Sequence, residues 1–503
     1  MTAVTPARDH GSRYRIEPTV RQALRSPRLL TREVLAGLVV ALALIPEAIA
    51  FSIIAGVDPR VGLFSSFIMA VTISFLGGRP AMISAATGAV ALVIAPVVRE
   101  HGMEYFIATV ILAGVIQLLL GALGVAKLMR FIPRSVMVGF VNALAILIFS
   151  AQVPQLIGVP WAVYPLTAIG LAIVFLLPRA TKAVPAPLVA IVVLTVAVVA
   201  LGIRVPNVGD QGELPTSLPA LFIPNVPFTL ETLGIIGPYA LAMALVGLME
   251  SLMTAKLVDD ITDTHSRKTR EALGQGGANI LSGLFGGMGG CAMIGQTMIN
   301  VKASGARTRI STFLAGAFLL VLVLVLGDLV AIIPMAALVA VMIFVSVATF
   351  DWHSIRLGTL RRMPKSETAV MLITVVATVV THNLAIGVVL GVLTAMVMFA
   401  RRVAHFVTVT REVDGDTARY RVDGELFFAS SNDLTTQFEY AADPRRVVID
   451  MSRSHIWDAS TVAALDAVIT KYAAHGTAVE ITGLNDTAAA FRDRLSGGLN
   501  AGH

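Results

Sequence analysis

Two short segments in otherwise apolar sequence place small and polar residues where they could bind a ligand. Each begins with Ala-Met-Ile, at residues 81–83 and, 211 residues later, at 292–294. In a membrane protein such interruptions are typical of broken helices, whose unpaired N-terminal amides face a ligand or water rather than lipid. Two helix N-termini aimed at one point bind an anion without a basic side chain, because each carries about half a positive charge. Close packing of helices is the alternative use of small residues here. The residues predicted to line the site are Ser84, Ala85, Ala86, Thr87, Gly295, Gln296 and Thr297.

Two glutamates, Glu47 and Glu250, lie deep in predicted membrane segments. A charged side chain at the centre of a bilayer costs roughly 2.5–3.5 kcal/mol or more, so an acidic residue there normally serves a cavity, a proton pathway or a coupling ion. The alternatives are a protonated glutamate hydrogen-bonded between helices and a position nearer the interface. Thr254, one turn after Glu250, is expected to place a hydroxyl beside the carboxylate. Glu47, Glu250 and Thr254 are therefore the predicted ion-coupling residues, and Phe51, one turn beyond Glu47, is expected to wall the site.

The composition requires that lipid solvates most of the chain. It is 56% hydrophobic and 14% charged, with a mean hydropathy of +0.80, whereas soluble domains are roughly 25% charged. The single cysteine, Cys291, excludes an intrachain disulfide. We find no phosphate-binding glycine loop, metal cluster or nucleophile–base pair, so we expect no enzyme, metal or organic cofactor. The basic pI of about 9.6 is attributed to the cytoplasmic membrane face rather than to nucleic-acid binding.

The spacing of apolar segments predicts a multi-span α-helical membrane protein with 14 transmembrane segments. The segments long enough to cross a bilayer, at about 20 residues each, are 34–56, 60–77, 104–125, 135–151, 163–178, 186–203, 232–257, 270–288, 308–327, 332–349, 367–382 and 385–401. These are twelve segments, and the shorter segments 80–98 and 290–303 bring the predicted number of crossings to 14. With the N-terminus inside, cytoplasmic loops carry 17 basic residues and external loops only Arg60, Arg99 and Arg204. This asymmetry predicts a cell-membrane protein with both termini cytoplasmic.

The order of the segments predicts two inverted seven-span repeats, because an odd number of crossings reverses the second half. The repeats are expected at about 34–203 and 232–402, and residues 44–47 match 247–250 at an offset of 203. Residues 1–33 are expected to form a cytoplasmic leader and residues 34–403 the transport domain. Residues 404–503 alternate strand-like and helix-like runs, which predicts a small soluble α/β domain. The expected strands are 420–423, 447–450 and 478–481, and the expected helices are 461–472 and 487–495.

The chain resembles the sulfate permease (SulP) family of anion transporters. The resemblance rests on LIPEAIAFSIIAGVDPRVGLFSSF in the first span, GLMESLMTAKLVDD in the eighth and GGMGGCAMIGQTMINVKASGARTRIS in the tenth. It implies core and gate domains built from intertwined repeats, elevator-like alternating access, a homodimer, and sulfate, bicarbonate, chloride or carboxylate as substrate. The tail, with VVIDMSRSHIWDASTVAALDAVI, resembles a STAS domain, the family's regulatory module. Asp458-Ala459-Ser460-Thr461 departs from the usual loop of that module, which argues against regulation by serine phosphorylation.

Two departures from the family pattern fall in the predicted site. Ala85-Ala86 stands where many relatives have Gly-Pro, and Gln296 stands where several have Arg. An anion held by helix dipoles alone is less well compensated, so we expect symport with H⁺ or Na⁺, with Glu250 as the coupling residue.

The leading interpretation is therefore a secondary transporter of a small inorganic or carboxylate anion. The STAS domain is a candidate site for a cytoplasmic partner, and we expect no binding of nucleic acid. The alternatives are a nucleobase or xanthine permease of the same fold, disfavoured by the lack of a second acidic residue in the tenth span, and a non-transporting anion sensor.

Overall fold

The structure is a computed structural model that describes residues 18–124, 132–180, 186–404, 407–428, 430, 434–485, 488–489, 492 and 494. It divides into two compact units, Met1–Val392 and Leu393–His503. Part of the predicted leader (1–17), the loop residues Lys127, Arg130 and Lys182, and most of the predicted helix 487–495 lie outside the described residues. The predicted domain boundaries at 33/34 and 403/404 stay predictions.

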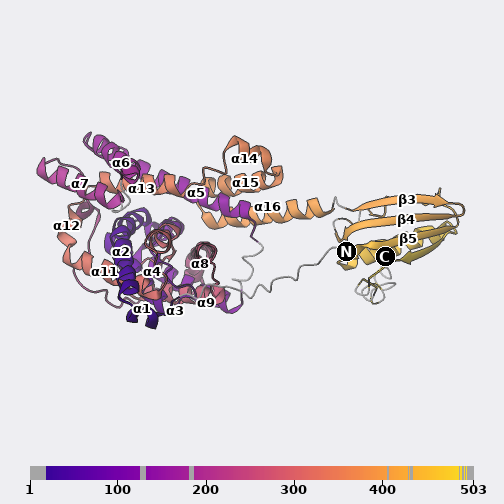
Figure 1. Cartoon of the computed structure of the whole chain (residues 1–503), viewed down its shortest axis with the longest axis horizontal. Coiled ribbons are helices and arrows are strands. Elements are labelled where there is room, and N and C mark those ends of the chain that lie inside the picture. The colour runs from indigo at the N-terminus through magenta and orange to yellow at the C-terminus, as the bar shows by residue number, and fades with distance from the viewer. Residues whose placement is uncertain are drawn as a thin grey trace, which may run out of the picture. The chain divides into compact units, whose positions relative to one another are not determined.

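The first half of the membrane unit consists of helices, which Figure 1 labels α1 to α7, and one two-residue strand. Its elements are α1 (Val20–Arg25), α2 (Pro27–Ala55), α3 (Pro59–Leu76), β1 (Ser84–Ala85), α4 (Gly88–Ala122), α5 (Arg134–Gln152), the 3₁₀ turn η2 (Val153–Leu156), α6 (Val163–Ala180) and α7 (Ala186–Ala200). Helix α4 is two helices joined at Gly102, whose φ of 82° and ψ of −177° are not helical. This break separates the predicted segments 80–98 and 104–125.

The second half repeats the pattern after the 3₁₀ turn η3 (Val208–Gln211). Its elements are α8 (Leu230–Thr262), α9 (Lys268–Leu284), β2 (Cys291–Ala292), α10 (Ile294–Met298), the π-helix η4 (Ile299–Ala303), α11 (Arg309–Val325), α12 (Gly327–Ala331), α13 (Met335–Thr349), α14 (Leu357–Arg362), α15 (Lys365–Thr381) and α16 (Leu384–Ala404). Each half thus has its strand before the helix that corresponds to the third or tenth predicted span.

The helices of the membrane unit form two groups, each drawn from both halves of the chain (Figure 1). Helices α2, α3 and α4 pack with α8, α9 and α11, while α5, α6 and α7 pack with α13 and α15. This is the intertwined core and gate arrangement that the sequence predicts. Both strands lie in the first group, which therefore positions the candidate site.

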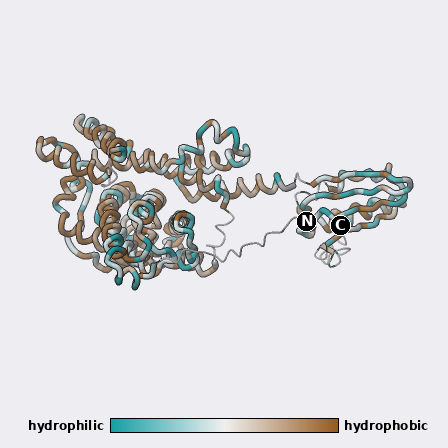
Figure 2. The backbone as a smooth tube through the Cα atoms, viewed as in Figure 1, coloured by the Kyte–Doolittle hydropathy of each residue, from teal (hydrophilic) through white to brown (hydrophobic). Residues whose placement is uncertain are grey.

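Apolar helices dominate this unit, as the predominantly brown helices of Figure 2 show. Seven of the described helices are long and apolar enough to cross a membrane, and three shorter apolar helices, including α11 and α13, accompany them. The fold is a multi-pass helical membrane fold, and the number of 14 crossings stays a prediction.

Strands β1 and β2 pair antiparallel inside the helical core, with Ser84 opposite Ala292 and Ala85 opposite Cys291. Non-helical backbone at membrane depth must have its polar groups paired by protein. Neighbouring side chains complete the pairing: Ser251 Oγ accepts from the Ala292 amide at 3.0 Å, and Asn279 Oδ1 accepts from the Gly290 amide at 2.8 Å. The sequence allows this strand pair to form because its small residues let the two backbones approach each other between the helices.

The second unit contains a four-stranded sheet in the order β3-β4-β5-β6, with one described long helix. Its elements are β3 (Thr408–Asp414), β4 (Thr417–Leu426), β5 (Arg446–Ile456), α18 (Ala459–Ala474) and β6 (Ala478–Thr482). The β3–β4 pair is antiparallel and the other two pairs are parallel. The three expected strands and the helix at 461–472 are present. The sequence analysis missed β3, because its side chains are almost all exposed and lack an apolar alternation.

A buried carboxylate joins three elements of this sheet domain. Asp443 is fully buried, accepts hydrogen bonds from the hydroxyls of Tyr420 and Tyr472 at 2.6 and 2.5 Å, and pairs with Arg411 of β3 at 2.7 Å. Burial raises the pKa of the Tyr472 hydroxyl, and its hydrogen bond to Asp443 raises it further. The tyrosines therefore stay neutral donors at physiological pH, which keeps the cluster intact.

We predict that Gly290→Ala destabilises the core. An added Cβ at Gly290 would lie 1.9 Å from the Ala85 carbonyl oxygen, so the strand pair would have to separate. Overpacking of this kind costs about 1–3 kcal/mol or more, and the thermal midpoint of the purified protein should fall by at least about 3 °C. Gly295→Ala is the matched control, because nothing lies within 4 Å of a Cβ there. Equal midpoints for the two variants would show that the strands are not closely paired.

Candidate functional site

The strand pair brings the starts of two helices, α4 and α10, to the same place in the core. Thr87 caps α4 in extended backbone (φ −131°, ψ 153°), and its Oγ1 accepts a hydrogen bond from the Val90 amide at 3.3 Å. Met293 precedes α10, and its side chain makes no capping hydrogen bond. Amides at a helix start attract negative charge because of the helix dipole.

The structure corrects the alignment of the two Ala-Met-Ile segments. Residues 81–83 precede β1, whereas Ala292 lies in β2 and Ile294 is the first residue of α10. The positions that match in structure are the caps Thr87 and Met293, which are 206 residues apart rather than 211. The match of the two Ala-Met-Ile segments therefore does not align structurally equivalent residues. It did identify the two interrupted elements that pair in the structure.

The structure also corrects how strongly the N-terminus of the second helix, α10, is expected to attract an anion. Helix α10 has only five residues, and the chain continues as a π-helix over Ile299–Ala303. A helix dipole grows with the number of aligned peptide groups. Helix α4 is therefore the stronger anion-attracting element, and side chains must supply more of the site beside α10.

Gln296 and Glu47 are in direct contact. The Gln296 amide Nε2 donates to the Glu47 carboxylate Oε1 at 2.7 Å, across from α10 to α2. Gln296 is 2% exposed, and its own Oε1 is buried without a hydrogen-bond partner among the described residues. An unpaired buried acceptor is costly, so this oxygen is available to a cation or a proton donor.

Glu250 is joined to the cap of α4 through Cys291. The thiol Sγ lies 2.9 Å from Glu250 Oε2, to which it donates, and 3.3 Å from Thr87 Oγ1. Glu250 is 7% exposed and Cys291 is fully buried. A continuous chain of polar groups thus runs from the carboxylate on α8 to the N-terminus of α4.

Several predicted site residues have other hydrogen-bond partners. The Thr254 hydroxyl does not lie beside the Glu250 carboxylate as expected, since it donates to the backbone carbonyls of Glu250 and Ala292 at 2.8 and 3.3 Å. Ser84 Oγ accepts from Gln275 of α9 at 2.7 Å, and Thr297 Oγ1 accepts from the Ile83 amide at 3.0 Å. These three side chains hold the interrupted backbone in place.

The remaining predicted residues are backbone or wall elements. Ala85 pairs with Cys291 across the strands, and the Ala86 amide donates to Ser66 Oγ at 3.2 Å. Phe51 is 3% exposed, and its ring is so close to the first residue of α4 that a Cβ on Gly88 would lie 2.8 Å from Phe51 Cε1. Gly295 faces open space. Phe51 therefore borders the start of α4, and its role as a wall of the site stays a prediction.

Neither Glu47 nor Glu250 forms an ion pair with any residue that the structure describes; their side-chain partners are Gln296 and Cys291. A buried carboxylate without a cationic partner is strongly disfavoured. The arrangement therefore combines an anion-attracting helix start with one buried carboxylate, Glu250, and one partly buried carboxylate, Glu47, neither of which is balanced by a described cation. Within the described residues no group of three or more His, Cys, Asp or Glu side chains could hold a metal.

The sequence analysis missed the polar residues that support the site. Cys291 was considered only for disulfides, although it immediately precedes Ala292. Asn279 and Gln117, which hydrogen-bond to each other at 2.8 Å, lie in apolar helices, where uncharged amides are also informative. Arg79 and Asp259 form a buried ion pair of 3.3 Å, which the sequence analysis did not identify.

Comparisons with known proteins agree with this architecture. Residues 30–167 and 161–374 match the model of the Sulfate permease family, and residues 408–495 match the STAS domain. The chain is 53% identical to a candidate sulfate transporter of Bacillus subtilis, YbaR, over 93% of this chain and 97% of that protein. It is 28% identical to the bicarbonate transporter BicA of a Picosynechococcus species over 75% and 71% of the two chains.

Two solved structures have the same fold. The transmembrane domain of a cyanobacterial bicarbonate transporter BicA aligns with a TM-score of 0.64 and 28% identity, covering 72% of this chain and 98% of that one. The murine anion transporter Slc26a9 aligns with a TM-score of 0.80 over 92% and 87% of the two chains, at 16% identity.

We predict that Cys291 resists alkylation in the folded protein, because its thiol is buried and hydrogen-bonded. Maleimide should modify the native protein on the order of 100-fold more slowly than the denatured protein. A cysteine introduced as Gly295→Cys in a Cys291→Ser background should react readily, since residue 295 is exposed. Rapid labelling of native Cys291 would contradict the described thiol–carboxylate contact.

Proposed function

The chain belongs to the sulfate permease family, and from that premise we propose that it is a secondary active transporter of a small anion. The anion is of the sulfate, bicarbonate or carboxylate class. It is held between the starts of α4 and α10 and moves by alternating access of the core helices against the gate helices. The names of the relatives, which are sulfate and bicarbonate transporters, support the substrate class.

One observation carries the proposal: the antiparallel pair Ser84–Ala85 with Cys291–Ala292, which sets two interrupted helices against each other. The Thr87-capped start of α4 supplies amides for the anion. Gln296, next to it on α10, supplies an amide group instead of a fixed positive charge. The site can therefore bind and release an anion without a permanent ion pair.

Cation coupling is the second part of the proposal. Glu47 and Glu250 flank the site without a described cationic partner, and an incoming anion adds further negative charge. A proton or Na⁺ that enters with the anion balances this charge. Glu250 is the proposed coupling residue because the Cys291 thiol connects it to the cap of α4, and Glu47 with the unpaired Gln296 Oε1 forms a second acceptor pair. Thr254 contributes by fixing the backbone of Glu250 and Ala292.

The setting follows from the same family membership and the charge asymmetry of the loops. We place the protein in the cell membrane with both termini cytoplasmic, as a homodimer whose STAS domain contacts a cytoplasmic partner. The family consists of transporters, so no enzymatic step is proposed.

We predict that Glu250→Gln removes the cation dependence of transport. Uptake of sulfate and of bicarbonate into proteoliposomes is measured against pH and Na⁺. The wild type should be accelerated by one of the two cations, and the variant should lose that acceleration, with an uptake rate lower on the order of tenfold. The reason is that glutamine keeps the shape of the side chain but neither ionises nor compensates a cation.

Glu231→Gln is the matched control, since Glu231 lies in the exposed first turn of the same helix, α8, and should leave the dependence unchanged. Equal rates for Glu250→Gln and wild type under all conditions would overturn the coupling role. No flux of any anion by the wild-type protein would favour the sensor alternative.

A further inference from the structure

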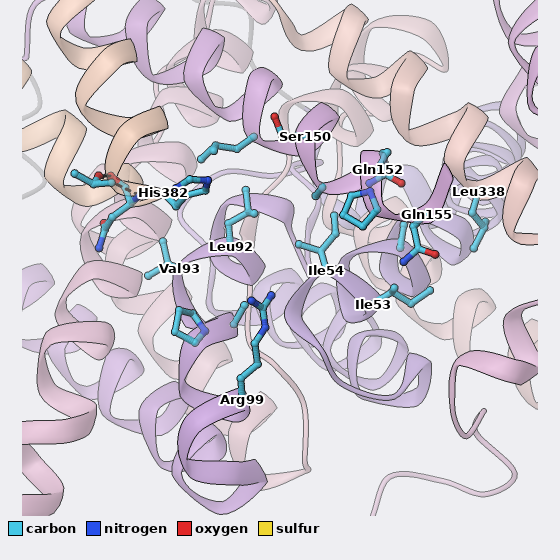
Figure 3. A pocket seen from close by; sticks show the side chains of 18 of the residues that line it. Ile53, Ile54, Leu92, Val93, Arg99, Ser150, Gln152, Gln155, Leu338 and His382 are labelled. Carbon is cyan, nitrogen blue, oxygen red and sulfur yellow. Dashed lines mark hydrogen bonds between the residues drawn. The ribbon is translucent and has the colours of Figure 1, made fainter. Parts of the chain in front are cut away.

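A cavity of about 590 Å³ lies between the two helix groups, away from the strand pair. It is lined by residues of α2, α4, α5, η2, α8 and α13 and of the turn between α15 and α16. Arg99 and His382 both extend into this space, and Gln152 and Gln155 approach it from the opposite side (Figure 3). The lining is mostly apolar with a few polar side chains, and a cavity of this size accommodates a small hydrated anion.

The charge of the cavity has one sign. Its described lining includes Arg99 and His382 and no acidic side chain. Arg99 forms no ion pair with any described residue, and the neighbouring Glu100 lies 3.9 Å from His101 instead. An unneutralised guanidinium in a concave site raises the local concentration of anions. The amides of Gln152 and Gln155, which approach from the opposite side, and the hydroxyl of Tyr239 are further donors in the lining.

The helix ends around the cavity all belong to one side of the predicted topology. The cavity is lined by the C-terminal ends of α2, α5 and α15, the end of the first part of α4, and the N-terminal halves of α8 and α13. With a cytoplasmic N-terminus these are the external ends, and Arg99 is one of the three basic residues expected outside. In the predicted topology the cavity therefore lies toward the external side of the membrane.

An apolar contact lies next to both the cavity and the candidate site. Ala50 of α2 lines the cavity and Glu47 lies three residues earlier, about 4.5 Å along the helix axis. Phe51 of α2 and Ile148 of α5, each next in the chain to a residue that lines the cavity, close on Gly88, where an added Cβ would lie 2.8 Å from the Phe51 ring and 3.3 Å from Ile148 Cδ1. This contact joins a core helix pair to a gate helix, so relative movement of the two groups would open it.

We propose that this cavity is a second, external anion-binding site, in which Arg99, with donors from His382, Gln152 and Gln155, holds a small inorganic or carboxylate anion. The anion waits there until the Phe51–Gly88–Ile148 contact opens toward the strand pair. Only the passage of the anion from this cavity to the strand pair rests on the proposed transport function. Binding of the anion in the cavity does not depend on that function.

The test is the charge selectivity of cysteine labelling in the full-length protein, reconstituted in vesicles. Ser150→Cys, at an exposed cavity-lining position, is made in the Cys291→Ser background. It is reacted from outside with the anionic sulfonatoethyl and the cationic trimethylammonioethyl methanethiosulfonates. The anionic reagent should label the cysteine on the order of tenfold faster than the cationic reagent, because the Arg99 guanidinium attracts it. Arg99→Gln should abolish this difference in labelling rate. External sulfate should slow the labelling only while Arg99 is present.

Arg204→Gln is the matched control, because Arg204 is also expected outside but does not line this cavity. Gln155→Cys provides a second reporter position in case Ser150→Cys does not fold. Labelling only from the vesicle interior, or a preference that Arg99→Gln leaves unchanged, would overturn the proposal. Labelling does not require flux. Anionic preference together with no transport by the wild-type protein would sink the proposed function and retain this site, and wild-type flux without labelling preference would do the reverse.

Discussion

The structure depends on pairing backbone polar groups where helices are interrupted inside the membrane. Lipid offers no partner to an amide or carbonyl, so a broken helix is stable only where protein supplies both. Here the two interruptions pair with each other as β1 and β2, and Ser251, Asn279 and Ser66 supply the remaining bonds. The close approach of the strands requires Gly290, and the resulting geometry fixes where both helices begin. The candidate site therefore results from the way in which the two interrupted backbones are paired.

The electrostatics of the site follow from the same geometry. The start of α4 points partial positive charge at a region that also holds Glu47 and Glu250. Gln296 and Cys291 can donate to these carboxylates but cannot neutralise them. We therefore propose that an anion occupies the site together with a positive charge, a proton or Na⁺, which is the basis of the proposed cotransport. The second anion site that we propose at Arg99 fits this arrangement, because an unneutralised guanidinium raises the anion concentration near a site that has no cationic partner among the described residues.

The sequence predicted the architecture well because lipid imposes simple rules. Apolar runs, the distribution of basic residues and the two interruptions indicated the membrane helices, the two interrupted elements and both glutamates, whereas the core and gate groups were implied by the resemblance to the family. Side-chain directions could not be predicted, since whether Thr254 faces a carboxylate or a carbonyl depends on how α8 is rotated against β2. The register of the Ala-Met-Ile segments was wrong because short apolar words recur by chance. The role of Cys291 was missed because its partners, Glu250 and Thr87, are 41 and 204 residues away in sequence.

The central claim is that an anion and a cation occupy this site together. The most direct test is equilibrium binding of radiolabelled sulfate and bicarbonate to the purified protein, with and without Na⁺ and at two pH values. Thermodynamic linkage requires that the coupled cation tighten anion binding, by about 5- to 150-fold for ordinary coupling energies. The account predicts such a decrease in the anion Kd for one of the two cations. An anion Kd that is independent of both Na⁺ and pH would contradict it.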